Sequence, residues 1–201
     1  MSLKVVGLCG GSGSGKSTVC SVFEQHGVPT IDTDAIYHEL TSHDSECLRE
    51  LVLAFGDEIV RDGALHRPTL AAIVFAKDSD KSLRDKLNKI THKHVLDEVR
   101  RRLAELESLG ALLTVVDVPL LFESGFDKEC DAVIAVVADT DVRVERIIAR
   151  DSITREHALA RISAQYANEW LIEHADHVID NNATTDELAK QICEIINKIL
   201  I

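Results

Sequence analysis

The feature that most constrains the fold is a glycine cluster that directly follows a short apolar run. Residues 7–18 read GLCGGSGSGKST and contain five glycines. Glycine loses more backbone entropy on folding than any other residue and adds no side-chain packing, so such a cluster requires a local reason. The apolar run at 3–9 favours a β-strand, and apolar residues at helical spacing over 17–26 favour an α-helix that ends at Gly27. The sequence therefore predicts a strand, a glycine loop and a helix in succession.

The loop satisfies a phosphate-binding pattern, Gly10-x4-Gly15-Lys16-Ser17. Its glycines allow backbone N–H groups to surround an anion, and the following helix N-terminus adds further donors. Lys16 would reach the β and γ phosphates, the Ser17 hydroxyl would coordinate Mg²⁺, and Thr18 would lie near the α phosphate. A solvated turn or a dinucleotide-binding loop would not require the Lys-Ser ending. The residues expected to bind the nucleotide are Gly11, Gly13, Ser14, Gly15, Lys16, Ser17 and Thr18.

Apolar runs alternate with helical patterns along the rest of the chain. Further strands are predicted at 28–31, 112–118, 131–138 and 177–181. Helical patterns cover 44–55, 68–76, 80–107, 140–150, 154–166 and 185–200, and another helix starts near Asp32 or Thr33. This alternation predicts a doubly wound α/β fold with a parallel sheet. The stretch from about 40 to 109 has no strong strand, so we expect a single domain over 1–201 with an inserted helical lobe.

Composition narrows the class of protein. A formal net charge of −12 argues against a nucleic-acid-binding protein, which would normally carry a basic surface. No apolar stretch is long enough to span a bilayer, and the N-terminus lacks the cleavage site of a signal peptide. The five cysteines are scattered without a CxxC pair, which indicates neither a zinc site nor a disulfide framework. We expect a cytoplasmic protein with no obligate protein partner.

Two aspartates occupy positions where phosphoryl transfer needs carboxylates. Asp34 follows the strand predicted at 28–31, at the edge where doubly wound sheets bind ligands. It could accept the proton of a substrate hydroxyl, or it could simply begin a helix. Asp117 ends the apolar run LLTVVD, as expected for a carboxylate that holds Mg²⁺ through water.

Three arginines share one face of a predicted helix. Arg143, Arg146 and Arg150 fall at spacings of three and four residues. Such a group could neutralise phosphates, either in place or as part of a lid, and Arg161 is a further candidate. The alternative is a solvated face whose ion-pair partners are Asp139, Asp141, Glu145 and Asp151.

Taken together, these residues resemble the dephospho-CoA kinase family nearly from end to end. The family loop GGxGSGKS corresponds to residues 10–17, and its hydrophobic-D-x-D element corresponds to 31–34. The further matches, in chain order, are Arg67 with LAAIVF, Asn88 with His92, PLLFE at 119–123, Arg150-Asp151, the segment 161–165 and Ile-Asp-Asn at 179–181.

The resemblance implies both a fold and a reaction. The fold would be that of a P-loop kinase, with three α/β/α layers, an inserted substrate-binding lobe and a helical lid at about 143–170. The reaction would transfer the γ-phosphoryl group of ATP to the ribose 3′-hydroxyl of dephospho-CoA, giving CoA and ADP. This is the final step of coenzyme A biosynthesis.

The resemblance also implies roles for individual residues. Asp34 would be the general base, and Lys16 and Arg150 would stabilise charge on the transferring group. Ser17 and Asp117 would organise Mg²⁺. The residues implied to bind dephospho-CoA are Asp34, Arg67, His92 and Arg161.

The chain departs from the family pattern at a few positions. Lys93 stands where the family usually has proline, His38 where it has an arginine-like residue, and Trp170 near a usual lysine. Two other functions stay open. One is a different small-molecule P-loop kinase, acting on a nucleoside or nucleoside monophosphate, and the other is a module that binds ATP without transferring its phosphate. A GTPase fits less well because the guanine-reading NKxD segment is missing.

Overall fold

The computed structural model describes residues 2–76, 81–182 and 184–201 of the 201-residue chain. They divide into two compact units. The first is formed by Met1–Asp32 together with Leu103–Ile201, and the second by Thr33–Arg102. Residue 80, the first of the helix predicted at 80–107, lies outside the described residues.

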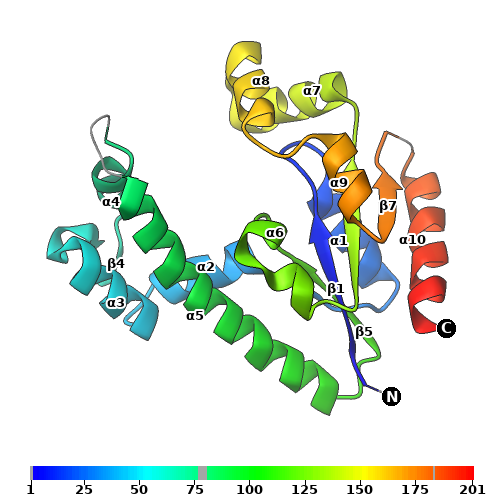
Figure 1. The fold of residues 1–201 in the computed structure, drawn as a ribbon, viewed down its shortest axis with the longest axis horizontal. Coiled ribbons are helices and arrows are strands. Elements are labelled where there is room, and N and C mark those ends of the chain that lie inside the picture. The colour runs from blue at the N-terminus through cyan, green and yellow to red at the C-terminus, as the bar shows by residue number, and fades with distance from the viewer. Residues whose placement is uncertain (1, 77–80, 183) are drawn as a thin grey trace. The chain divides into compact units, whose positions relative to one another are not determined.

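The first unit contains a parallel sheet of five strands in the order β2-β5-β1-β6-β7 (Figure 1). Its apolar strands are covered on both faces, as near-continuous apolar runs predict. Because β1 lies in the middle, the glycine loop leaves from the centre of the carboxyl edge, where such sheets bind ligands. The strands confirm the five predicted ones and are β1 (Lys4–Cys9), β2 (Thr30–Asp32), β5 (Leu113–Asp117), β6 (Ala132–Val137) and β7 (His177–Asp180).

One face of this sheet is covered by α1 (Lys16–Gln25) and α10 (Thr185–Leu200), which also contact each other. The fully buried Phe23 of α1 and Ile192 of α10 pack into the same core as Val6, Val115 and Ile134 of the strands. Both predicted helices are therefore confirmed.

The opposite face is covered by short elements that follow β5. A Cβ atom on Gly7 of β1 would lie 2.9 Å from Cys130 Sγ and 3.0 Å from Leu121 Cδ1, so these side chains lie directly against the strand. The elements are α6 (Leu121–Ser124) and the 3₁₀ turn η2 (Phe126–Glu129). Helices thus flank the sheet on both faces, which confirms the predicted α/β/α fold class.

Three helices lie between β6 and β7. The helices predicted at 140–150 and 154–166 are confirmed as α7 (Thr140–Asp151) and α8 (Arg155–Ser163). A third helix, α9 (Asn168–His174), was not predicted because seven residues are too few for a clear apolar period.

The second unit has its own apolar core, which includes the fully buried Leu51, Ile59 and Val74. Its elements are α2 (Thr33–Thr41), α3 (Glu46–Phe55), η1 (Asp57–Ile59), β3 (Val60–Arg61), β4 (Ala64–Leu65), α4 (Arg67–Val74) and most of α5 (Lys81–Ser108). The helices match the predicted patterns. The antiparallel β3–β4 pair was not predicted, although its Asp62-Gly63 turn, in which both residues have positive φ, is a known hairpin signal.

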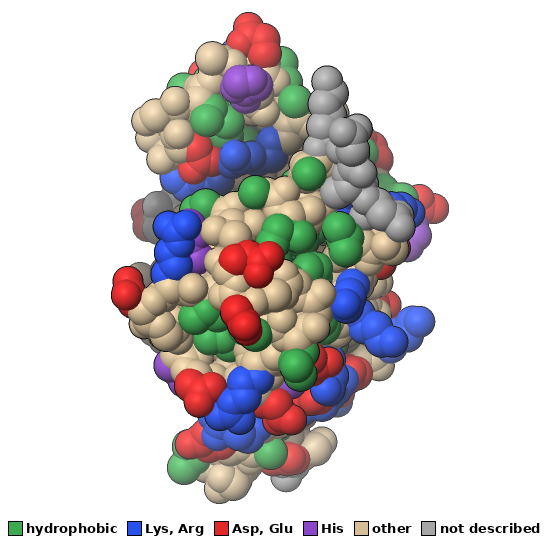
Figure 2. All heavy atoms as spheres, turned by 90° about the vertical axis from the view of Figure 1, so that its left-hand side faces the viewer, with side chains coloured by type: hydrophobic (Ala, Val, Ile, Leu, Met, Phe, Trp, Pro, Cys, Tyr) green, Lys and Arg blue, Asp and Glu red, His purple; other side chains and the backbone are tan. Residues whose placement is uncertain are grey.

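Charged side chains of both signs are interspersed over the face drawn in Figure 2. The acidic surplus in the composition is therefore not gathered into a single-sign surface on that face. Among the described residues, no helix combines the length and the apolar character that a membrane span requires.

Candidate active site

The glycine loop connects β1 to α1 and takes a conformation that needs glycine at two positions. Gly13 and Gly15 have φ values of 77° and 91°, in the left-handed region that other residues rarely adopt. The surroundings are equally restrictive, because a Cβ atom on Gly15 would lie 2.0 Å from the Asn181 side chain. The ten-residue helix α1 follows at once, so its unsatisfied N–H groups and positive dipole end adjoin the loop.

Lys16, the first residue of α1, folds back toward the loop. Its Nζ donates to the Gly10 carbonyl oxygen at 3.1 Å and lies 3.9 Å from Asp117 Oδ1. Both side chains are only 17% exposed. A cation is thus placed between the loop and the end of β5, where a phosphate could replace its present contacts. The exposed Ser17 and Thr18 are the next two residues of the helix.

Sheet register brings the predicted metal-binding aspartate to the loop. Asp117 pairs with Leu8 of β1 on one side and with Asp32 of β2 on the other. Its carboxylate therefore lies at the same edge as Ser17, the second residue of α1. Carboxylate and hydroxyl oxygens are ligands that suit Mg²⁺, which usually keeps several waters and takes others from phosphates. These two residues fit such an ion. The described residues contain no group of three or more His, Cys, Asp or Glu side chains placed to hold a metal by themselves.

Side chains from 143–181 hold the loop from outside, and sequence reasoning did not assign them this task. Arg143 Nε donates to the Ser12 carbonyl oxygen at 2.9 Å, and the Ser12 N–H donates to Gln165 Oε1 at 2.8 Å. Arg146 Nη1 donates to the Gly13 and Ser14 carbonyl oxygens, each at 3.3 Å. Asn181 Nδ2 adds a buried bond of 2.7 Å to the Ser14 carbonyl oxygen. The arginine cluster, the segment 161–165 and the Ile-Asp-Asn segment had drawn attention to these residues, but not to their contacts with the loop backbone.

The predicted arginine cluster is therefore divided between two surroundings. Arg143 and Arg146 bind loop carbonyls, whereas the 61% exposed Arg150 pairs with Asp151 through bonds of 2.8 and 2.9 Å. Arg161 of α8 binds the same carboxylate. The Arg150 hydrogen bond, followed by that of Arg161, lowers the pKa of Asp151 to about 2. Arg150 and Arg161 thus share one carboxylate, and both side chains are exposed.

The remaining predicted site residues belong to the second unit. Asp34 lies in the first turn of α2, two residues beyond β2. Arg67 begins α4, donates to Thr41 Oγ1 at 3.1 Å and lies with its guanidinium 5.5 Å from the centre of the Tyr37 ring. His92 lies on α5.

A pocket lies beside the loop within the first unit. It is lined by Gly10 and Gly11 of the loop, by residues of the segment 119–123 and by Gln165 and Tyr166. An aromatic column borders it. The Tyr166 and Trp170 rings are stacked at 3.9 Å, the Trp170 and His174 rings at 3.8 Å, and Phe122 contacts all three edge-on. Trp170, one of the departures from the family pattern, is the centre of this column.

The other two departures lie in the second unit. Lys93 pairs with Glu50 of α3 at 3.1 Å, and the neighbouring His94 Nε2 lies 2.6 Å from the same oxygen. A proline at position 93 would interrupt the long helix α5. His38 lies in the last turn of α2, where a basic side chain suits the helix dipole.

Two cysteines near the loop do not offer a nucleophile. Cys9 ends β1 and Cys20 lies in α1, and burial raises the pKa of each thiol to about 12. A thiol with such a pKa is protonated at neutral pH and reacts poorly. Neither thiol is therefore suited to act as a nucleophile beside the loop.

Comparison with known proteins agrees with this geometry. The model of the dephospho-CoA kinase family matches residues 4–187. A dephospho-CoA kinase from Corynebacterium efficiens is 40% identical over 196 residues, which cover 97% of this chain and 96% of that protein. A Thermus thermophilus protein of known structure has a TM-score of 0.83 at 30% identity, with 98% of each chain covered. The Campylobacter jejuni dephospho-CoA kinase has a TM-score of 0.71 at 23% identity, covering 98% of this chain and 97% of its own.

Proposed function

The chain belongs to the dephospho-CoA kinase family, and we propose that it transfers the γ-phosphoryl group of ATP to the ribose 3′-hydroxyl of dephospho-CoA. The products are CoA and ADP. The single observation that carries this proposal is the glycine loop with Lys16 folded over it toward Asp117. The match to the family over almost the whole chain supplies the identity of the acceptor.

ATP binding rests on the loop between β1 and α1. Its left-handed glycines open space for the triphosphate, and the start of α1 offers N–H donors with the positive end of a helix dipole. Lys16 then exchanges its contact with Gly10 for the β and γ phosphates. Ser17 and Asp117 would hold Mg²⁺, which when bound neutralises charge on the phosphate oxygens.

The acceptor hydroxyl needs a base. Asp34 takes this role because it directly follows the β2 edge and a carboxylate can accept the proton that the 3′-hydroxyl loses on attack. Arg67, His92 and Arg161 bind the CoA precursor. The guanidinium groups of Arg67 and Arg161 suit it because dephospho-CoA carries phosphates, and the His92 imidazole can donate a hydrogen bond to the same ligand.

Charge on the transferring group is stabilised by Lys16 and Arg150. Arg150 is exposed at the end of α7 and is paired with Asp151, and it would exchange part of that contact for a phosphate. The segment around 143–170 forms the lid that excludes water during the transfer, which prevents hydrolysis of ATP. All five cysteines are free, which suits the reducing cytoplasm that we propose as the site of the reaction.

An acceptor screen tests the proposal. Purified protein is incubated with ATP and Mg²⁺, and ADP release is followed with dephospho-CoA, adenosine or AMP as the acceptor. CoA is the matched control because its 3′-hydroxyl is already phosphorylated. We expect ADP release with dephospho-CoA and only background release with CoA. Transfer to adenosine or AMP but not to dephospho-CoA would assign the chain to a different acceptor, and ATP binding without any transfer would make it a binding module.

A further inference from the structure

Arg143 is a buried cation with an incomplete set of partners. Its surface is only 2% exposed, and burial lowers the pKa of its guanidinium. Nε donates to the Ser12 carbonyl oxygen at 2.9 Å and Nη1 donates to Asn168 Oδ1 at 3.3 Å. Nη2 is buried and has no hydrogen-bond partner among the described residues. Within the same residues, no carboxylate forms an ion pair with Arg143. Burying a charge with incomplete hydrogen bonding costs free energy. If position 143 only had to fill space, an apolar residue would stabilise the fold more.

Both backbone polar groups of Ser12 are bound by side chains from 143–168. While Arg143 holds the carbonyl oxygen, Gln165 Oε1 accepts the Ser12 N–H at 2.8 Å. The Asn168 side chain, which accepts from Arg143, donates through Nδ2 to the Ala138 carbonyl oxygen at 2.9 Å, directly after β6. The position of the loop is thus fixed against the sheet through Arg143 and Asn168.

The loop backbone packs directly on Arg143. A Cβ atom on Gly11 would lie 2.2 Å from Arg143 Nη2, and one on Gly13 would lie 2.6 Å from the Arg143 carbonyl oxygen. Neither approach is possible with a residue larger than glycine. Gly11 is therefore matched to the Arg143 guanidinium, whereas Gly13 meets backbone that any residue at position 143 would present.

We propose that Arg143 is a positioning residue for phosphoryl transfer: together with Gln165 and Asn168 it fixes Ser12, and thereby sets the curvature of the loop that binds ATP. It does not touch the phosphates itself. The rigid fork of a guanidinium suits this task because it reaches two acceptors at once in a defined geometry. The proposal rests on ATP binding by this loop, which is part of the proposed function.

Arg143→Met tests the role because it keeps much of the side-chain volume and removes every donor. We expect the KM for ATP to rise about tenfold and kcat to fall by a similar factor, while the KM for dephospho-CoA stays unchanged, because only the loop is displaced. Arg143→Lys should not restore either value, since an ammonium lacks the fork. The matched control is Lys190→Met, which removes an exposed cation on α10, outside the lobe and the lid, and should leave both values unchanged.

Several outcomes would overturn the proposal. A lower melting temperature with unchanged KM for ATP and unchanged kcat would mean that Arg143 only stabilises the fold. Should Arg143→Met fail to fold, Gln165→Ala removes the other Ser12 contact from an exposed side chain, and an unchanged KM for ATP in that variant would also contradict the proposal. Failure of the proposed function would be recognised separately, because the wild-type protein would then not phosphorylate dephospho-CoA. ATP titration of the wild type and of Arg143→Met would still measure the effect of Arg143 on ATP binding.

A double-mutant cycle makes the contact itself testable. Gly11→Ala in the wild-type background should weaken ATP binding about tenfold or more, because the new methyl group displaces the guanidinium. In the Arg143→Ala background the same change should cause little further loss, since Nη2 is no longer there. Equal losses of ATP affinity in both backgrounds would show that Gly11 and Arg143 act independently and would contradict the proposal.

Discussion

Lys16 illustrates how a single side chain can be held ready for a ligand. Its ammonium lies between the Gly10 carbonyl oxygen at 3.1 Å and Asp117 Oδ1 at 3.9 Å, and neither contact is a close ion pair. Phosphate oxygens would form shorter, charge-assisted bonds with the same group. The carboxylate and the carbonyl thus keep the cation near the loop until the nucleotide binds.

We expect Lys16→Ala to weaken ATP binding and to lower turnover by at least about 100-fold, because a donor to the transferring phosphate is lost. Isothermal titration with ATP and steady-state kinetics with dephospho-CoA measure the two effects. Lys190→Ala, at an exposed position on α10, is the matched control and should behave as wild type. Unchanged turnover in Lys16→Ala would contradict the role assigned to the loop.

Substitution of Asp34 should lower turnover but leave ATP affinity nearly unchanged, unlike substitution of Lys16, which should affect both. Asp34→Asn keeps the shape of the side chain and removes the proton acceptor, so we expect turnover to fall by roughly 100-fold or more with little change in ATP affinity. Rapid-quench measurement of the transfer step, together with ATP titration, separates the two. Near-normal turnover would exclude Asp34 as the base, and an equal loss of ATP affinity would indicate a binding role instead.

For single residues, the sequence predicted positions along the backbone better than side-chain contacts. The loop residues and Asp117 could be placed because the motif and the strand end define their positions along the backbone. The tasks of Arg143, Arg146 and Gln165 could not, because a long side chain can reach several targets and the sequence does not show which backbone atoms lie near it. Helical spacing placed the arginines on one face but could not distinguish a buried guanidinium from a solvated one.

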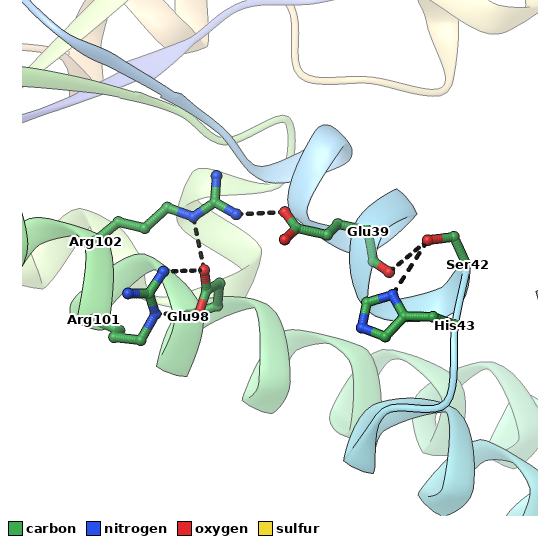
Figure 3. Close-up of polar contacts among 6 residues, drawn as sticks. All are labelled: Glu39, Ser42, His43, Glu98, Arg101 and Arg102. Atoms are coloured by element: carbon green, nitrogen blue, oxygen red, sulfur yellow. Dashed lines mark hydrogen bonds and ion pairs between the residues drawn. The ribbon is translucent and has the colours of Figure 1, made fainter.

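Among the elements, α5 is held to α2 by a network of charged side chains within the second unit (Figure 3). Arg102 donates to Glu39 Oε2 at 2.5 Å and to Glu98 Oε1 at 2.8 Å, and Arg101 binds Glu98 through bonds of 2.7 and 2.8 Å. The hydrogen bond from Arg101 and the one from Arg102 lower the pKa of Glu98 to about 2. Glu98 is therefore the anion shared by both arginines.

The lowered pKa of Glu98 gives a stability effect with a defined sign. A carboxyl group with a pKa of about 2 in the folded state and an ordinary value near 4.5 in the unfolded state stabilises the fold fully above pH 4.5. That contribution is lost as the pH falls toward 2. We expect Glu98→Gln to reduce the free energy of unfolding by up to about 1 kcal/mol at pH 7, the usual range for partly exposed ion pairs.

Urea unfolding of wild type and Glu98→Gln at pH 7, 4 and 2.5 measures the effect. The difference in unfolding free energy should be largest at pH 7 and should shrink steadily on acidification. Glu107→Gln, at an exposed position on the same helix, is the control and should show a small difference at every pH. A difference for Glu98→Gln that is constant with pH would mean that its charge does not contribute.

The elements that the sequence did not predict are all short, although the short strands β2 and β7 were predicted. The helices α3, α5, α7 and α10 repeat their apolar period often enough to be recognised, and the strands β1, β5 and β6 are near-continuous apolar runs. In α6, η2 and α9 the chain turns once or twice, and tertiary contacts such as Leu121 against Gly7 decide the conformation. The β3–β4 hairpin is the exception, because its Asp-Gly turn was a readable signal.

For the molecule as a whole, the central parallel sheet followed from the alternation of apolar runs with helical patterns. The strand order β2-β5-β1-β6-β7 could not be predicted in this way, because it depends on where in the sheet each crossover connection places the next strand. That order brings Asp117 beside the loop. The sequence predicted Asp117 as a metal-binding residue, but its position next to the loop could be seen only in the fold. The helical lobe at about 40–109 and the lid at about 143–170 stay predictions about how the chain works with its substrates.

The most direct test of the account is to locate the transferred phosphate. Purified protein, ATP, Mg²⁺ and dephospho-CoA are incubated to completion, and the product is analysed by ³¹P NMR and mass spectrometry. We expect a new phosphomonoester coupled to the ribose 3′ proton, together with one ADP for each CoA formed. ADP without this phosphomonoester, or a phosphate attached at any other hydroxyl group, would contradict the assignment.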